Sequence, residues 1–140
     1  MIRHRRTAGA ILISETDRAR IQDLLADGAR RLSPVMALLE KKLELATVVR
    51  SDQIPSDVVT LNSRIRVLDS AADAEYGFRL VIPGTTSCVG DVSILAPVGA
   101  AALGLRSGQE IFWYGRSGRK VNLRILDIVY QPEAMGQYHL

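Results

Sequence analysis

The chain has 140 residues, of which 47% are hydrophobic and 24% charged, and this balance excludes a disordered chain and predicts one ordinary domain or two very small ones. No apolar run approaches the roughly 18 residues of a membrane span, and the apolar stretch 8–13 is too short for a signal peptide. The single cysteine, Cys88, rules out an intrachain disulfide, so we expect a cytoplasmic protein that does not enter a membrane.

The formal net charge of +3 is unevenly distributed along the chain. Residues 1–50 hold 10 Lys and Arg against 6 Asp and Glu, whereas residues 51–140 hold 8 against 9. Three of the extra positive charges are Arg3, Arg5 and Arg6 near the N-terminus. A basic end of this kind can attract nucleic acid, but the simpler interpretation is a solvated, loosely held terminus.

Two helices are predicted in the first third of the chain, after a short apolar stretch 11–13 that we expect to lie extended. Ser14 is a good N-cap for the first helix, and Asp17 sits in a first turn that favours negative charge. Ser33-Pro34 is a strong start signal for the second helix. Because the connection is short, the two helices should form an antiparallel hairpin with arms of about 16 residues, roughly 24 Å long. Four charged residues of the second helix fall mostly off its apolar face: Glu40, Lys41, Lys42 and Glu44.

A polar stretch at residues 50–57 contains Pro55, and we interpret it as a linker between an N-terminal arm and hairpin (1–49) and a second domain (58–140). Beyond it the hydrophobic period changes from helical to two, which indicates β-strands. The sequence therefore predicts an α+β protein, a helical hairpin followed by a largely antiparallel sheet with one short helix. The expected elements are strands at 59–67, 76–82, 92–95, 110–114 and 121–130, a turn at 69–75, a short helix at 97–104 and a tail at 131–140.

Residues that usually carry catalysis or bind metals are sparse. The only histidines, His4 and His139, lie at opposite ends of the chain, and no spacing of Cys and His resembles a metal site. Cys88 stands in a small polar loop without an obvious histidine to act as its base. We therefore predict no catalytic residue, no metal and no cofactor.

The expected hairpin tip carries both signs of charge. Asp23 and Asp27 are four residues apart, so they share a helix face and could hold Mg²⁺ through water. Arg30 and Arg31 follow at once and would neutralise the tip. A solvated helix face is therefore the simpler interpretation of the two carboxylates.

Three separated stretches resemble one protein family. Residues 92–108 (VSILAPVGAAALGLRSG) resemble the C-terminal domain of the Gre transcript-cleavage factors, which carry a Ser-Pro-Leu-Gly type of segment here. Residues 58–64 (VVTLNSR) and 130–134 (YQPEA) are closer still to one branch of that family, the regulators of nucleoside diphosphate kinase. The resemblance covers about residues 50–135 and implies an FKBP-like fold for the C-terminal domain.

The resemblance also implies a partner. In Gre factors the C-terminal domain docks on RNA polymerase at the rim of the secondary channel, and a long N-terminal coiled coil enters the channel, where acidic tip residues help to hold a catalytic Mg²⁺. In this sequence the matching contact would be a loop in which Ala96 replaces the usual Ser, namely Leu95, Ala96, Pro97, Val98 and Gly99.

This sequence departs from the Gre pattern in its short hairpin, which lacks an acidic tip of the Gre type. The resemblance therefore implies an RNA polymerase-binding transcription regulator that does not stimulate transcript cleavage and that competes with Gre factors. A link to nucleoside diphosphate kinase would be indirect.

Two other functions remain open from the sequence. Direct nucleic-acid binding through the arginine-rich start is one, but the second half of the chain is net negative and shows no aromatic platform interleaved with basic residues, so direct DNA binding is not expected. The other is prolyl isomerisation, which FKBP-type folds perform and which needs an aromatic-lined apolar pocket. The candidates for such a pocket are Tyr76, Phe78, Phe112, Trp113, Tyr114 and Tyr130. Aromatic residues in strands more often belong to a hydrophobic core, which is the simpler interpretation.

Overall fold

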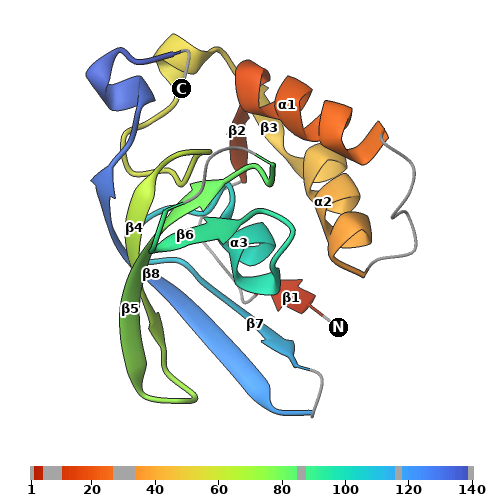
Figure 1. Cartoon of the computed structure of the whole chain (residues 1–140), viewed down its shortest axis with the longest axis vertical. Coiled ribbons are helices and arrows are strands. Elements are labelled where there is room, and N and C mark those ends of the chain that lie inside the picture. The colour runs from red at the N-terminus through yellow and green to blue at the C-terminus, as the bar shows by residue number, and fades with distance from the viewer. Residues whose placement is uncertain (1, 5–10, 27–33, 85–87, 116–117, 139–140) are drawn as a thin grey trace.

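The computed structural model describes residues 2–4 (backbone only), 11–26, 34–84, 88–115 and 118–138. Within these ranges two β-sheets are combined with three α-helices and two short 3₁₀ turns (Figure 1). The elements in chain order are β1 (Ile2–His4), β2 (Leu12–Ser14), α1 (Glu15–Ala26), α2 (Pro34–Leu45), β3 (Thr47–Val49), η1 (Ser51–Gln53), β4 (Arg64–Asp69), β5 (Ala74–Val81), β6 (Asp91–Ser93), α3 (Pro97–Ala102), β7 (Glu110–Tyr114), β8 (Lys120–Tyr130) and η2 (Glu133–Met135).

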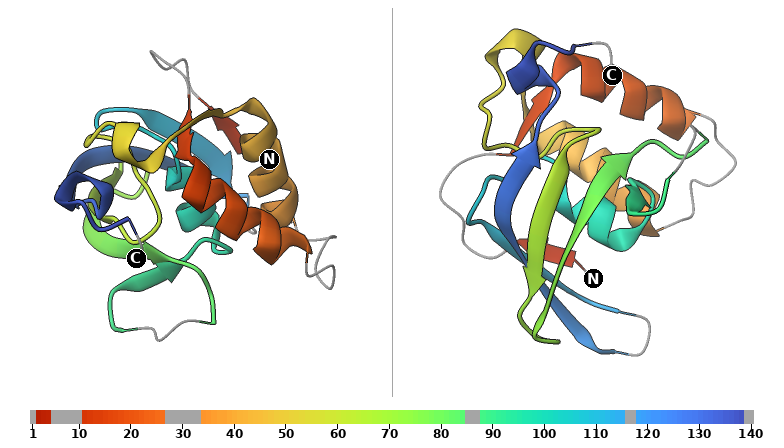
Figure 2. Two further views of the ribbon diagram at one scale, coloured as in Figure 1. Left: turned by 90° about the horizontal axis from the view of Figure 1, so that it is seen from above. Right: turned by 60° about the vertical axis from the view of Figure 1, so that its left-hand side comes forward.

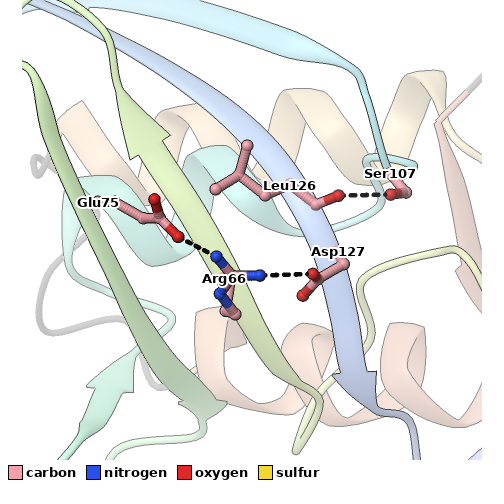
Figure 3. A network of polar contacts seen from close by, with 5 residues as sticks. All are labelled: Arg66, Glu75, Ser107, Leu126 and Asp127. Atoms are coloured by element: carbon pink, nitrogen blue, oxygen red, sulfur yellow. Dashed lines mark hydrogen bonds and ion pairs between the residues drawn. The ribbon is translucent and has the colours of Figure 1, made fainter.

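A curled, six-stranded sheet in the order β1-β7-β8-β4-β5-β6 forms most of the molecule. Its neighbouring strands run antiparallel except β5 and β6, which are parallel. Burial alternates along β4, so that Ile65 and Val67 face the core and Arg66 faces solvent. On the solvent side Arg66 forms ion pairs with Glu75 of β5 and, at 2.8 Å, with Asp127 of β8 (Figure 3). One side chain thereby connects three neighbouring strands.

The helices gather on one side of this sheet (Figures 1 and 2). The short helix α3 contacts β6 and β8, and it also contacts α2, which in turn contacts α1. The strands β2 and β3, which flank the two N-terminal helices in the chain, pair in parallel as a separate small sheet. No helix in the described ranges is both long enough and apolar enough to cross a membrane.

One hydrophobic core runs through the whole molecule. Ile13, Ile21 and Leu39 of the N-terminal segment belong to the same buried cluster as residues of β4, β5, α3 and β8. Ile54, within the predicted linker at 50–57, is buried as well, and that stretch includes η1. The core is therefore continuous across the predicted linker, and the division into separate folding units stays a prediction.

Some elements have the predicted bounds and others do not. The strand β7 matches its prediction, and α3 begins at Pro97 as expected. The helices α1 and α2 have 12 residues each instead of about 16. The helix α2 ends early because Thr47–Val49 leaves the helical path and pairs with β2. The first strand after the predicted linker starts at Arg64 rather than 59, since the chain turns at Asn62, whose φ is 68°. The expected connection between the helices, residues 27–33, lies outside the described residues.

The N-terminus holds a strand where the sequence predicts a loose, solvated end. β1 pairs antiparallel with β7, and Arg3 stands opposite Phe112 in the register. The prediction is therefore wrong for residues 2–4, because backbone groups at the edge of a sheet gain partners from any segment that can reach them. Arg5 and Arg6 lie outside the described residues.

The prediction of a C-terminal tail at residues 131–140 is also wrong for the first residues of that range. Gln131 is only 3% exposed, and its Nε2 donates hydrogen bonds to the carbonyl oxygens of Pro55 (2.7 Å) and Val58 (2.8 Å). The turn η2 follows at Glu133–Met135. The residues after β8 therefore hold the end of the predicted linker against the sheet.

We predict that Gln131→Ala lowers the free energy of unfolding by about 1–3 kcal/mol, because it removes a donor from the buried Val58 carbonyl and one of the two donors of the half-buried Pro55 carbonyl. Urea denaturation followed by circular dichroism measures the effect. Gln53→Ala, at an exposed position of η1, is the matched control and should change stability much less. Equal stability of the two variants would contradict the proposed anchoring role of Gln131.

Candidate functional site

Residues 95–99 comprise the end of the connection from β6 and the first three residues of α3, and Ser93 organises this turn. The Ser93 hydroxyl accepts a hydrogen bond from the Leu95 N–H (3.0 Å), and its carbonyl accepts one from the Ala96 N–H (2.9 Å). Pro97 occupies the first turn of α3, where a missing N–H costs nothing. Pro97 is exposed, whereas Leu95 and Val98 are half-buried and pack on the core. The turn therefore presents a small, rigid apolar surface centred on Pro97.

Gly99 pins the start of α3 against the sheet. A Cβ at this position would lie 2.3 Å from the Ser93 carbonyl oxygen and 3.0 Å from Leu80 Cδ1. The first distance is shorter than real Cβ contacts, so no other residue fits without moving the backbone. The predicted loop residues are thus held together in one fixed turn.

Lys42 holds the other end of α3. Its Nζ donates hydrogen bonds to the carbonyl oxygens of Ala101 (2.7 Å) and Leu103 (2.6 Å), where the helix leaves carbonyl groups without partners of their own. The side chain is only 1% exposed, and burial lowers its pKa from 10.5 to about 7. The prediction that Lys42 falls off the apolar face is wrong, because its side chain is buried and reaches backbone acceptors of α3.

Asp17 is a second ionisable residue in the interior. Its place in the first turn of a helix predicts only a favourable negative charge, yet Asp17 is only 2% exposed and its Oδ2 accepts a hydrogen bond from the Leu61 N–H (3.0 Å). Burial is the main reason why the pKa of Asp17 rises to about 7. The hydrogen bond from the Leu61 N–H lowers this pKa and the nearby Glu133 carboxylate raises it, each by less than burial does. The predicted N-cap is confirmed, because the Ser14 hydroxyl accepts from the Asp17 N–H at 3.1 Å.

A polar network continues from Asp17 toward the C-terminus. The Thr60 hydroxyl donates to Glu133 Oε1 (2.8 Å), and it lies 2.8 Å from the Ser63 hydroxyl. The Thr60 N–H donates to the same Ser63 oxygen at 3.0 Å. Residues of α1, the turn at 60–63 and η2 therefore meet at one polar junction, which sequence spacing alone does not reveal because its members lie far apart in the chain.

The other predicted site, the hairpin tip, is only partly described. Asp23 is exposed on α1, and Asp27, Arg30 and Arg31 lie outside the described residues. Cys88 is exposed. Among the residues that the structure describes, no three His, Cys, Asp or Glu side chains are close enough to hold a metal ion. A groove of about 510 Å³ lies between the two N-terminal helices and has no aromatic lining, its residues being Arg18, Gln22, Leu25, Ala26, Glu40, Leu43 and Glu44.

The comparison with known proteins decides the family. Residues 54–130 match the family model described as "Transcription elongation factor, GreA/GreB, C-term". The chain belongs to this GreA/GreB family. The matched segment contains the turn at 95–99, all of α3 and strands β4 to β8. The resemblance read from the three sequence stretches is thereby confirmed.

Individual relatives in the GreA/GreB family extend the match to the N-terminal helices. The "Regulator of nucleoside diphosphate kinase" of Escherichia coli (strain K12) is 39% identical over 132 residues, which is 93% of this chain and 96% of that protein. A solved "Prokaryotic transcription elongation factor GreA/GreB from Nitrosomonas europaea" is 36% identical, with a TM-score of 0.70 over 88% of this chain and all of that one. The "Transcription elongation factor GreA" of Clostridium acetobutylicum is 29% identical over 70% of this chain but only 59% of its own length. These relatives are named as regulators or transcription factors, not as enzymes.

We predict that Asp17 makes stability fall as pH rises from about 5 to 7. With a folded pKa near 7 and an ordinary value of 3.8, the folded state binds more protons than the unfolded state throughout this window. The free energy of unfolding should drop by roughly 2 kcal/mol across it. In Asp17→Asn, whose amide oxygen can still accept from Leu61, this part of the drop should disappear.

Urea denaturation of the wild-type and Asp17→Asn proteins at pH 5, 6 and 7 measures the difference in how their free energies of unfolding depend on pH. The contributions of the other titrating groups cancel in this difference because both proteins contain them. Parallel stability curves over this pH range would show that Asp17 does not retain its proton in the folded protein.

Proposed function

We propose that this chain is a transcription regulator that binds RNA polymerase near its secondary channel. Membership of the GreA/GreB family supports the class of function. The observation that carries the docking proposal is the turn at 95–99, in which an exposed proline at the start of α3 is held between the Ser93 hydrogen bonds and the buried Gly99. With such a partner the protein would act in the cytoplasm.

The turn has the properties of a docking contact. Both its ends are fixed before any partner binds, so binding would cost little conformational entropy. Pro97 lacks an N–H and presents only apolar atoms and a restricted backbone. Leu95 and Val98 are half-buried on either side of it, and they extend the apolar surface without being lost to the core. We assign the contact to Leu95, Ala96, Pro97, Val98 and Gly99.

We further propose that the chain does not stimulate transcript cleavage. Helices of 12 residues are about 18 Å long, and their apolar residues Ile21 and Leu39 are committed to the core of the protein. They would therefore form a short antiparallel hairpin that stays beside the C-terminal domain and does not reach far into a channel. If this protein binds at the same rim of the polymerase secondary channel as a GreA/GreB factor, it would exclude that factor. It would not supply an acidic side chain to the catalytic Mg²⁺.

Three further points concern the C-terminal domain, prolyl isomerisation and nucleoside diphosphate kinase. We propose that residues 58–140 form an FKBP-like domain, with the curled sheet and α3 as its frame. Prolyl isomerisation is disfavoured, because Phe78 and Trp113 are buried in the core and do not line the groove between α1 and α2. For nucleoside diphosphate kinase, which appears in the name of the Escherichia coli relative, we propose an indirect link.

We predict that Val98→Asp weakens binding to RNA polymerase at least tenfold while the protein remains folded, because a charge at the contact must be desolvated on docking. Surface-immobilised polymerase and purified protein give the dissociation constant, and circular dichroism checks the fold. Val129→Asp places the same charge at an exposed valine of β8 and is the matched control.

Unchanged affinity of a folded Val98→Asp protein would rule out residues 95–99 as the contact. Unfolding of this variant, but not of Val129→Asp, would show instead that Val98 serves the core.

We predict competition with a cleavage-active Gre factor. With polymerase and the Gre factor held constant in a backtracked complex, adding this protein should reduce transcript cleavage in proportion to its occupancy. Added without the Gre factor it should produce no shortened transcripts. Val98→Asp should fail to inhibit at the same concentrations. Cleavage that stays constant while this protein is demonstrably bound would show that the two proteins use different sites.

A further inference from the structure

We propose that Lys42 is a positioning residue that couples the N-terminal helices to the docking turn at residues 95–99. Lys42 holds the C-terminal end of α3, and the N-terminal end of the same helix forms part of that turn. The inference rests on the proposed function, because it takes residues 95–99 as the polymerase contact. It concerns a residue outside that contact, on α2, and gives the N-terminal helices a role in how the contact is presented.

The bonding of Lys42 differs from that of an ordinary surface lysine. Lysines are rarely buried unless paired with an acid, yet this one is 1% exposed and its two hydrogen bonds go to backbone carbonyls, not to a carboxylate. The acceptors, Ala101 and Leu103, are themselves buried at the end of α3. Because these carbonyls come from a different element, the amine joins α2 directly to α3.

The helix α3 is suited to transmit a displacement from one end to the other. It has six residues, so it is about 9 Å long. Its N-terminal end is fixed where Gly99 meets the Ser93 carbonyl, and its C-terminal end is fixed by Lys42. Residues 99–102 between these points are buried throughout. A helix this short and this tightly packed moves as one body, so releasing its C-terminal end should also shift or loosen the turn at 95–99.

The test compares Lys42→Met, which has similar length but no donor, with Lys41→Met, which removes the same charge at the exposed neighbouring position. Lys42→Met should raise the dissociation constant for RNA polymerase about tenfold, and Lys41→Met should leave it within about twofold. In the free protein, hydrogen–deuterium exchange of the Ala100 and Leu103 N–H groups should accelerate in Lys42→Met only. Both groups are bonded within or beside α3, to the carbonyls of Ala96 and Gly99.

A second control separates positioning from stability. Gln131→Ala removes a buried hydrogen-bonding side chain far from α3 in the chain and is expected to be destabilised as well, yet it should bind polymerase with unchanged affinity as long as it is folded. If Lys42→Met binds as weakly as proposed while Gln131→Ala does not, loss of stability is not the cause. Lys42→Gln, which is shorter but polar, serves if Lys42→Met does not fold, and the same loss of affinity and faster exchange are expected.

A folded Lys42→Met or Lys42→Gln protein with wild-type affinity and wild-type exchange in α3 would overturn the inference. Failure of the wild-type protein to bind polymerase would instead overturn the docking proposal. The exchange measurement needs no polymerase, so it would still decide whether Lys42 holds α3 in place.

Discussion

The backbone groups of residues 99–105 face three different parts of the chain, and the fold depends on giving each of them a partner. Lys42 of α2 bonds the carbonyls at 101 and 103, while the carbonyl of Gly104 accepts from the N–H of Leu12 in β2 and its N–H donates to Val59. The carbonyl of Leu105 accepts from the Val59 N–H at 2.9 Å. Buried backbone groups without partners are costly, so the contacts from β2, α2 and Val59 together stabilise the end of α3.

Gly104 shows how tight this arrangement is. Its φ of +82° is a conformation that side chains disfavour, and a Cβ there would lie 2.4 Å from Ile11 Cγ2. The glycine therefore both ends the helical region and lets the N-terminal segment approach. The proposed function depends on the turn at 95–99, only a few residues before Gly104. This close packing explains how the small apolar surface of that turn can be held in a defined orientation.

Local signals in the sequence identify many of the elements, because the residues that cause them are neighbours. The N-cap at Ser14, the start of α3 at Pro97 and the bounds of β7 follow from capping chemistry and alternation. Asp17 and Lys42 are different: their burial depends on backbone partners 44 and about 60 residues away, which no local pattern contains. The strands β1 and β3 are missed for the same reason, since short strands form only when a distant edge is available. The turn at 95–99 was identified through family resemblance, and the hairpin tip stays a prediction.

The pairing of β1 with β7 has a consequence for how the protein behaves in concentrated solution. Without residues 2–4, the outer edge of β7 would offer a row of free N–H and C=O groups to any neighbouring molecule. Edge strands of this kind are the usual starting points for strand exchange and aggregation. β1 therefore moves this edge of the sheet from the five-residue strand β7 to a strand of only three residues, and so short an edge offers less backbone for pairing with a second copy.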